Sequence, residues 1–441
     1  MQANDLNTIK PANTPSANHQ PNNQYDGKPN NHQNHIVIIG AGLAGWSVVD
    51  AIRAKDKEIG ITLITADTAD RYHKPMLSTA ISQNKTRKQL IRNTGTEAAA
   101  TLGITLMTHT WVTTIDAKGH RLSLLNQASS QSNLSKRSQK HDGKHDEKHH
   151  TTLVYDKLVI ATGASVALPP NFAKFDKDIQ QNLWHVNHLD CFDGLQTALS
   201  QGTSHIAIIG AGMVGCEMAE DLNNAGHHVN LIDTHPAPLA SLLPPMATTR
   251  LADALRKSGI TLWLGQQVSN ITQANDNNLA YQLTLIPFDS HTSDTTKMVS
   301  LQVDHVIVST GLKVDSQFIA SSGLEYHPRT GIVVNENTLQ TSMADIYAIG
   351  DCMSIGGVAC RYVAPLRMQA TTIADDILGN EHAGYQHKSP MIRLKNKSIS
   401  IIATGTPNGR GHWQSVSDDM DGLKLEQIDN QQNVMATATI K

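Results

Sequence analysis

Two glycine-rich turns carry the clearest chemical signal in this sequence of 441 residues. They read Gly40-Ala41-Gly42-Leu43-Ala44-Gly45 and Gly210-Ala211-Gly212-Met213-Val214-Gly215. In a G-x-G-x-x-G turn the first glycine permits a tight bend. The second lets the backbone approach a pyrophosphate, and the third lets the next helix pack closely. The helix N-terminus then offers free N–H groups and a positive dipole end to the phosphates. The two turns together predict two dinucleotide sites.

An acidic side chain after each turn is the candidate partner for a ribose. Asp233 ends the second unit's next strand, where its charge would repel a 2′-phosphate, so we expect NADH to be preferred over NADPH. In the first unit Thr65 stands at that place and Asp67 follows. Asp67 either binds the ribose or caps its own turn. Two sites in one chain suggest FAD in one and a pyridine nucleotide in the other, with the two rings stacked face to face for hydride transfer.

Each turn needs a strand before it and a helix after it, and the hydrophobic pattern supplies both. The predicted strands are residues 35–39, 61–64, 206–209 and 229–232. One predicted helix follows the first turn and ends near residue 54, and the other covers residues 214–224. This alternation predicts an α/β fold with two Rossmann-like dinucleotide-binding domains, each built on a parallel sheet with helices on both faces.

The composition argues against several other classes of protein. Lys and Arg number 36 against 39 Asp and Glu, and aromatic residues make up 4%, so neither a basic field nor stacking platforms for nucleic acid are expected. No apolar run approaches the length of a membrane span, and no signal peptide is recognisable, so we expect a cytoplasmic protein without membrane insertion. The four cysteines form no CxxC pair, and we expect no metal site.

Two polar stretches interrupt this pattern. Residues 1–34 nearly lack aliphatic side chains, which predicts a disordered tail. Residues 127–150 end in a histidine-rich run between strand-like segments at 122–125 and 153–155, which predicts a loop inserted in a hairpin. The histidines of this loop have no fixed spacing, so we expect a solvated loop rather than a metal site.

Further segments resemble the flavoprotein family with two dinucleotide domains, the pyridine nucleotide-disulfide oxidoreductase-like proteins. They are Leu158-Val159-Ile160-Ala161-Thr162-Gly163-Ala164, Val306-Ile307-Val308-Ser309-Thr310-Gly311-Leu312 and Ile346-Tyr347-Ala348-Ile349-Gly350-Asp351-Cys352. Within that family, other segments are similar to the rubredoxin–NAD reductases. These are Tyr72-His73-Lys74-Pro75-Met76-Leu77-Ser78, Gly215-Cys216-Glu217, Asp221-Leu222, Pro238-Leu239, Leu242-Leu243-Pro244 and Tyr362-Val363-Ala364-Pro365-Leu366.

The resemblance implies a division into domains. An FAD-binding domain would comprise residues 35–170 and 305–385, an NAD-binding domain residues 171–304, and a small α+β C-terminal domain residues 386–441. Family members usually add a short helical stretch after the final strand. We therefore expect the C-terminal domain to be shortened here.

The resemblance also implies roles for individual residues. Near the adenosine half of FAD it places the pyrophosphate-binding turn, Ala66 and Asp67, and Val112, which meets the adenine through its backbone. Against the flavin it places Lys74, Asp351, Val363 and Lys395, and Glu217 sits beside the flavin on the nicotinamide face. Lys74 and Glu217 are the candidate catalytic residues. Their alternatives are a solvated loop lysine and a helix-face glutamate favoured by the dipole.

Electrostatics supports two of these roles. The Lys74 ammonium near flavin N5 or O4 would favour the reduced, anionic ring. A helix that starts near Pro365 would do the same at N1 and O2 through its dipole. Cys216 and Cys352 lie in the family segments, and we interpret them as small packing residues.

The function that follows from the resemblance is transfer of electrons from NADH through FAD to rubredoxin, feeding alkane hydroxylation. Basic residues at Lys85, Arg87, Lys88 and Arg92 would steer the acidic partner, or they form an ordinary charged surface helix. A dithiol reductase is excluded because no cysteine precedes Cys191. The alternatives are the ferredoxin reductase of an oxygenase system, whose members carry Arg-Pro where this chain has Lys74-Pro75, and a non-catalytic flavin or NADH sensor.

Overall fold

The structure, a computed structural model, describes residues 35–126, 150–274, 279–288, 298–315, 317–388, 391–405 and 411–441. The predicted tail at residues 1–34 lies outside this part of the chain, and so does the predicted insertion apart from His150. No helix in the described ranges combines the length and the apolar character that crossing a lipid bilayer requires.

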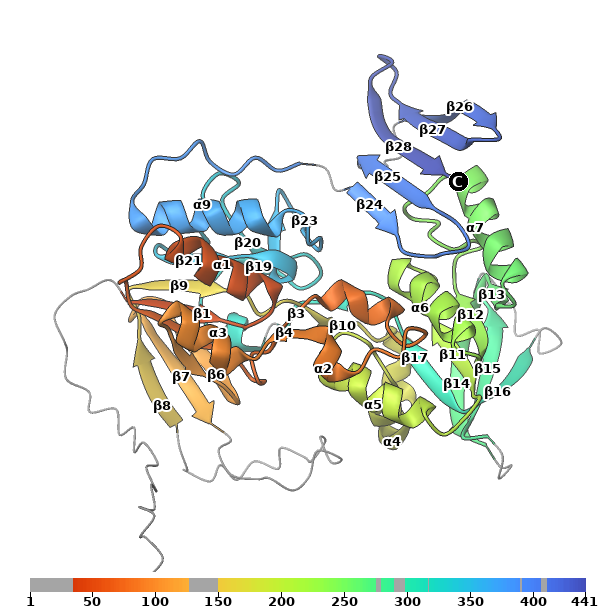
Figure 1. Cartoon of the computed structure of the whole chain (residues 1–441), viewed down its shortest axis with the longest axis horizontal. Coiled ribbons are helices and arrows are strands. Elements are labelled where there is room, and N and C mark those ends of the chain that lie inside the picture. The colour runs from red at the N-terminus through yellow and green to blue at the C-terminus, as the bar shows by residue number, and fades with distance from the viewer. Residues whose placement is uncertain are drawn as a thin grey trace, which may run out of the picture. The chain divides into compact units, whose positions relative to one another are not determined.

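The first glycine turn directly follows a strand of a five-stranded parallel sheet. Its order is β21-β9-β1-β2-β5, with β1 at Ile36–Ile39, β2 at Ile61–Ile64, β5 at Thr105–Met107, β9 at Lys157–Ile160 and β21 at Ile346–Ala348. The strands β1 and β2 are buried along their whole length, as expected for strands covered on both faces. Helices α1 (Leu43–Arg53) and α9 (Leu366–Leu378) pack against each other above this sheet (Figure 1). The predicted strand–turn–helix–strand unit is confirmed here.

The second glycine turn directly follows a strand of a second parallel sheet, which has four strands. Its order is β13-β12-β11-β17, with β11 at His205–Ile209, β12 at His228–Asp233, β13 at Thr261–Leu264 and β17 at His305–Val308. The core on one face of this sheet includes residues of α5 (Leu189–Leu199), α6 (Met213–Asn224) and α7 (Pro245–Lys257). The core on the other face includes residues of the antiparallel strands β14 (Gln266–Gln273), β15 (Tyr281–Pro287) and β16 (Val299–Val303). The second predicted strand–turn–helix–strand unit is confirmed as well, but the prediction of helices on both faces is wrong for this sheet, because antiparallel strands contribute the core on its other face.

Smaller elements connect these sheets. The strands on either side of the predicted insertion, β7 (Arg121–Asn126) and β8 (His150–Val154), pair antiparallel beside β6 (Thr110–Asp116). Strand β10 (Ser165–Val166) pairs with β18 (Leu312–Lys313). The other elements are β3 (Arg71–Tyr72), η1 (Lys74–Thr79), α2 (Arg87–Leu90), β4 (Ile91–Asn93), α3 (Gly95–Leu102), η2 (Pro170–Lys174), α4 (Lys177–Asn182), α8 (Gln317–Ala320), β19 (Tyr326–His327), β20 (Gly331–Val333), η4 (Gly350–Cys352), β22 (Met353–Ile355) and β23 (Val358–Ala359).

The described residues from 391 onward form an antiparallel sheet of five strands. Its order is β24-β25-β28-β27-β26, with β24 at Met391–Leu394, β25 at Ile401–Gly405, β26 at His412–Asp419, β27 at Gly422–Ile428 and β28 at Val434–Ile440. Buried side chains such as Leu423, Leu425 and Ile440 join the core that α6 and α7 also share. The last strand of the described chain is therefore a central strand of this sheet.

Candidate active site

The first glycine turn has the shape that a pyrophosphate needs. Gly40 has φ +104°, and a Cβ on it would lie 2.4 Å from the carbonyl oxygen of Ala161. A Cβ on Gly45 would lie 1.9 Å from the oxygen of Gly40, whereas one on Gly42 would meet nothing within 4 Å. The outer glycines are thus required by close packing, and the middle one leaves open space at the start of α1. This cradle fits the phosphates of a dinucleotide.

The second turn repeats this geometry. Gly210 has φ +107°, and a Cβ on it would lie 2.6 Å from the oxygen of Ser309. A Cβ on Gly215 would lie 1.9 Å from the oxygen of Gly210, and Gly212 again faces open space. The predicted Ala161-Thr162-Gly163 segment and the Ser309-Thr310-Gly311 segment therefore support their turns in the same way.

Asp233 lies directly beside the second turn. Its Oδ2 accepts a hydrogen bond of 2.5 Å from the backbone N–H of Ala211, and its Oδ1 accepts one of 2.7 Å from the N–H of His235. The predicted ribose partner is thus held at the carboxyl end of β12, next to the open space at Gly212.

Asp67 has protein partners on both carboxylate oxygens. Oδ1 accepts hydrogen bonds of 2.8 Å from the Thr65 hydroxyl and from the N–H of Ala69, so the residue does cap its own turn. Oδ2 lies 2.8 Å from Nε2 of His188, just before α5. Burial raises the pKa of Asp67, but these hydrogen bonds outweigh it and leave the pKa below its usual range. Ala66 lies between β2 and this residue.

A cluster of three side chains forms where α6 meets two other segments. Glu217, which is 2% exposed, accepts a hydrogen bond of 2.6 Å from the Ser78 hydroxyl and forms an ion pair with Lys395. The Lys395 ammonium also lies 2.9 Å from the Ser78 oxygen, and the Lys395 backbone N–H donates to Glu217 Oε1 at 3.1 Å. The structure thus brings Glu217 and Lys395 together. Ser78 lies in a segment that the sequence had singled out, but without a role.

Two more acids on α6 fasten it to its neighbours. Glu220 accepts hydrogen bonds of 2.7 Å from the backbone N–H groups of Lys397 and Ser398. Asp221 accepts one of 2.8 Å from the N–H of Ile81 and another from the Ser82 hydroxyl. The helix that starts at the second glycine turn is therefore anchored to the segment after β24 and to the segment after η1. Asp221 lies in a segment that carries the family resemblance, but no role was assigned to it, and nothing in the sequence alone distinguished Glu220 from a surface acid.

Lys74, at the start of η1, and Asp351 are largely buried charged groups that influence each other electrostatically. Burial lowers the pKa of Lys74, and the nearby negative charge of Asp351 partly offsets this. Burial raises the pKa of Asp351, and the charges of Lys74 and Arg361 oppose that rise. Because Lys74 begins η1 and Ser78 lies within it, this short helix joins Lys74 to the Glu217 cluster.

The remaining predicted residues lie around these groups. Gly350 begins η4 beside Asp351, and a Cβ on it would lie 3.0 Å from the Cβ of Ala44. Val363 is 40% exposed and lies just before α9, whose N-cap is Pro365. Val112 lies in β6 and packs against the core of the first sheet.

Two cysteines beside these motifs are packing residues, as predicted. Cys216 and Cys352 are fully buried, and burial raises the pKa of both thiols, that of Cys352 to about 11. Neither side chain is therefore a thiolate near neutral pH, where a dithiol mechanism would need one.

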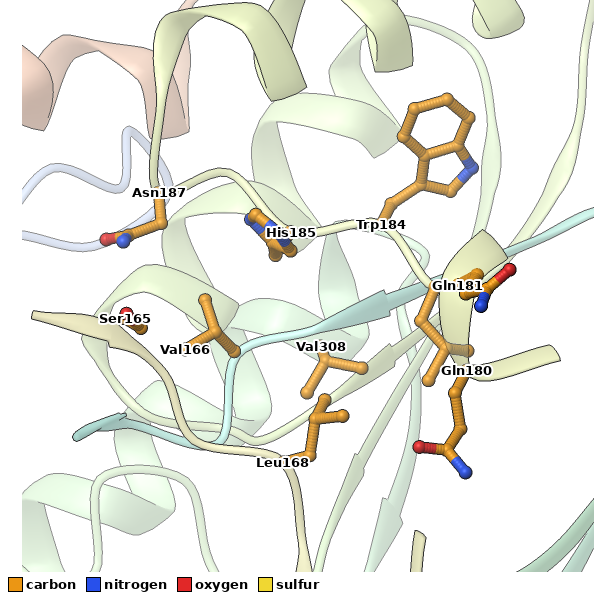
Figure 2. A pocket seen from close by; sticks show the side chains of 10 residues that line it. Ser165, Val166, Leu168, Gln180, Gln181, Trp184, His185, Asn187 and Val308 are labelled. Carbon is orange, nitrogen blue, oxygen red and sulfur yellow. The ribbon is translucent and has the colours of Figure 1, made fainter. Parts of the chain in front are cut away.

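A cavity of about 390 Å³ is lined by residues other than the predicted site residues (Figure 2). One of its walls includes Val308, which belongs to the core on the β14–β16 face of the second sheet rather than on the α6 face. His185 also lines it, and its Nδ1 is buried without a hydrogen-bond partner in the described part of the chain. The full lining is Ser165, Val166, Leu168, Gln180, Gln181, Leu183, Trp184, His185, Asn187 and Val308. The cavity contains no residue that the sequence assigned to FAD or NAD(H).

Comparison with known proteins decides the family. Residues 34–374 match the family described as pyridine nucleotide-disulphide oxidoreductase. The chain belongs to this family. It is 32% identical over 404 residues to a protein named nitric oxide reductase FlRd-NAD(+) reductase from Escherichia coli O127:H6, covering 91% of this chain and 94% of that one. The protein of the same name from Shigella flexneri has the same identity and coverage.

Solved structures share the fold of this oxidoreductase. The covalent putidaredoxin reductase–putidaredoxin complex gives a TM-score of 0.77 at 23% identity, covering 93% of this chain and 90% of that one. NADH:rubredoxin oxidoreductase from Clostridium acetobutylicum gives 0.67 at 22% identity, covering 92% and 91%. The family, the relatives and the two glycine cradles together identify an FAD-dependent pyridine nucleotide oxidoreductase. It is a flavoprotein reductase of the ferredoxin and rubredoxin reductase kind.

Proposed function

We propose that this flavoprotein takes electrons from NADH and delivers them through FAD to rubredoxin. The observation that carries the proposal is the Glu217–Lys395–Ser78 cluster, because it lies at the start of α6 beside the second glycine turn. The short helix η1 connects this cluster to Lys74, the residue proposed to lie against the flavin. The charged groups proposed for the two rings therefore belong to one connected set of segments.

The chain's own residues would bind the two cofactors, orient them and stabilise charge on the flavin. The first turn would hold the FAD pyrophosphate, with Asp67 and Val112 toward the adenosine. The second turn and Asp233 would hold the nucleotide, with Gly311 beside it. Bound FAD supplies a two-electron acceptor that can release electrons singly. The Lys74 ammonium and the start of α9 would stabilise negative charge where it develops on a reduced ring.

We also propose the division of labour along the chain. Residues 35–170 and 305–385 bind FAD, residues 171–304 bind the nucleotide, and residues 386–441 contribute Lys395 to the cluster. The parallel pairing of β21 with β9 supports the split first domain, because it adds a strand from beyond the nucleotide segment to the first sheet.

The names of the relatives and the surface charges support rubredoxin as the partner. Lys88 and Arg92 are exposed and available for steering, whereas Arg87 is already paired with Asp190. Alkane hydroxylation stays part of the proposal as the reaction that consumes the electrons. The name of the Escherichia coli relative adds nitric oxide reduction as a competing use of the electrons.

A ferredoxin reductase is the second candidate, since the fold is shared with putidaredoxin reductase. Side-by-side rates of electron transfer from the NADH-reduced protein to rubredoxin and to a plant-type or putidaredoxin-type ferredoxin distinguish the two. Faster reoxidation by rubredoxin is the expected result. Reoxidation by ferredoxin alone would transfer the assignment to the second candidate, and reoxidation by neither carrier would favour a sensor.

A further inference from the structure

The aspartate proposed to lie toward the adenosine of FAD is held in place from a distant segment of the chain. Nε2 of His188 lies 2.8 Å from Asp67 Oδ2. The Thr65 hydroxyl and the Ala69 N–H donate to the other carboxylate oxygen, Oδ1. Both oxygens are thus fixed by protein groups, yet the Asp67 side chain is still 32% exposed. The carboxylate is therefore oriented before a ligand arrives and remains within a ligand's reach.

Asp67 lies at the edge of the first sheet where the glycine turn begins. Strands β1 and β2 pair in parallel with Ile39 opposite Ile64, so their carboxyl ends meet at this edge. The N–H of Gly40 donates to the oxygen of Ile64 at 2.7 Å, and Asp67 follows shortly after Ile64 in the sequence. A dinucleotide whose pyrophosphate lies on the turn would extend its adenosine ribose toward the end of β2.

The position of His188 is itself fixed by contacts between α5 and the residues after β2. His188 is the N-cap residue of α5, and its ring lies edge-on to the Tyr72 ring, with the ring centroids 6.2 Å apart. The Leu189 N–H donates to the Tyr72 hydroxyl at 3.3 Å. Asp190, in the first turn of α5, forms an ion pair with Arg87. These contacts hold the start of α5 where the imidazole reaches Asp67.

We propose that His188 is a positioning residue for FAD, although it belongs to the segment 171–304 that is proposed to bind the nucleotide. By fixing Oδ2, it holds the Asp67 carboxylate in the orientation in which a ribose hydroxyl can donate to it. This inference rests on the proposed function, because it takes the first glycine turn as the FAD site.

The imidazole and a ribose can share this carboxylate. Asp67 stays ionised near neutral pH because its hydrogen bonds keep its pKa below the usual range. An ionised carboxylate has about four lone-pair sites on its two oxygens, so the bond to His188 leaves room for a further donor. Without the imidazole, the Asp67 side chain gains rotational freedom, and part of the binding free energy of FAD is used to order it.

The effect should be confined to the adenosine half of the cofactor. A flavin whose adenosine ribose lacks its hydroxyls makes no hydrogen bond to Asp67, so its affinity should not depend on His188. A histidine that merely supported the fold would instead affect both flavins equally. Comparing the two flavins therefore separates positioning of Asp67 from general support of the structure.

The test starts from flavin-loaded proteins and measures dissociation constants from the release of flavin on dilution, followed by flavin fluorescence. The ligands are FAD and an FAD analogue without the 2′- and 3′-hydroxyls of the adenosine ribose. The proteins are wild type, His188→Asn and Thr197→Ala. Asparagine still caps α5, but its shorter side chain does not reach Asp67. Thr197 is an exposed residue of α5 whose hydroxyl donates to the Asp193 backbone oxygen within the helix, so it is the matched control.

We expect His188→Asn to raise the dissociation constant of FAD about tenfold and that of the analogue less than about twofold, with Thr197→Ala equal to wild type for both. An unchanged FAD constant in His188→Asn would overturn the inference. An equal loss for FAD and the analogue would also overturn it, because His188 would then support the fold alone. Both results leave the proposed function intact, whereas a wild type that binds neither flavin would contradict the proposed function itself, and the inference with it.

Discussion

Glu217 and Lys395 form an ion pair across 178 residues of sequence. The carboxylate is almost fully buried, and the Lys395 side chain is one-third exposed. A buried carboxylate is costly unless it is paired and hydrogen-bonded, and Ser78 and the backbone N–H of Lys395 complete its partners. The ion pair therefore holds the Glu217 carboxylate near the start of α6, two residues after the last glycine of the second turn.

Removing the ammonium should slow reduction of the flavin. In Lys395→Met the carboxylate of Glu217 loses its counter-charge, so we expect NADH to reduce the bound flavin about 10- to 100-fold more slowly, with FAD still retained. Anaerobic stopped-flow absorbance measures the rate. Lys397→Met, two residues away, removes a lysine that forms no ion pair with Glu217 and donates to α6 through its backbone N–H, so it should leave the rate unchanged. Equal rates in all three proteins would remove Lys395 from the site.

Substitutions at two glycines of the first turn should have different effects, one on FAD binding and the other on stability. Gly42 has φ −74° and open space around a Cβ, so Gly42→Val should fold but purify without FAD, because the side chain occupies the pyrophosphate position. Gly45→Ala places a Cβ against the oxygen of Gly40 and should lower the free energy of unfolding by about 1–3 kcal/mol even without FAD. Flavin content and thermal unfolding of the flavin-free proteins separate these outcomes. A fully yellow Gly42→Val protein would contradict the first turn as the FAD site.

His188 should contribute stability that disappears in alkaline solution. Its ring lies between Asp190 and Asp67, and hydrogen bonds to these two carboxylates raise its pKa to about 9. A raised folded-state pKa means that the stabilisation is complete below the unfolded pKa of about 6.5 and is lost as the pH rises through about 9.

His188→Asn should therefore unfold more easily than wild type at about pH 6, by about 1–2 kcal/mol after allowance for a partly exposed ring, and the difference should vanish by about pH 10. Chemical denaturation of both proteins in excess FAD at the two pH values measures it. A difference that stays constant with pH would mean that the imidazolium charge contributes nothing and that shape alone matters.

The two glycine turns show what could be predicted from the sequence. Each consists of six neighbouring residues between a strand and a helix, so their backbone geometry follows from local spacing. The strands and helices around both turns were predicted almost to the residue for the same reason. Glu217 was singled out because it follows the second turn directly, within a segment that resembles the family.

The contacts between segments could not be predicted in this way. The position of Lys395 beside Glu217 depends on where the C-terminal sheet packs, and no local pattern encodes that. The bond from His188 to Asp67 joins residues 121 apart. Ser78 belongs to the cluster only because its hydroxyl donates to Glu217 on α6. Glu220 looks like an ordinary helix-surface acid until the segment that covers it is in place, and Asp221, although part of a segment that resembles the family, had no predicted role.

Anaerobic titration of the purified protein with NADH tests the central claim most directly, because it asks whether one chain holds FAD and lets a pyridine nucleotide reach it. We expect a yellow protein whose flavin absorbance is bleached by about one equivalent of NADH and returns when oxidised rubredoxin is added. A protein that is colourless and takes up no added FAD, or a bound flavin that NADH leaves unchanged, would contradict it.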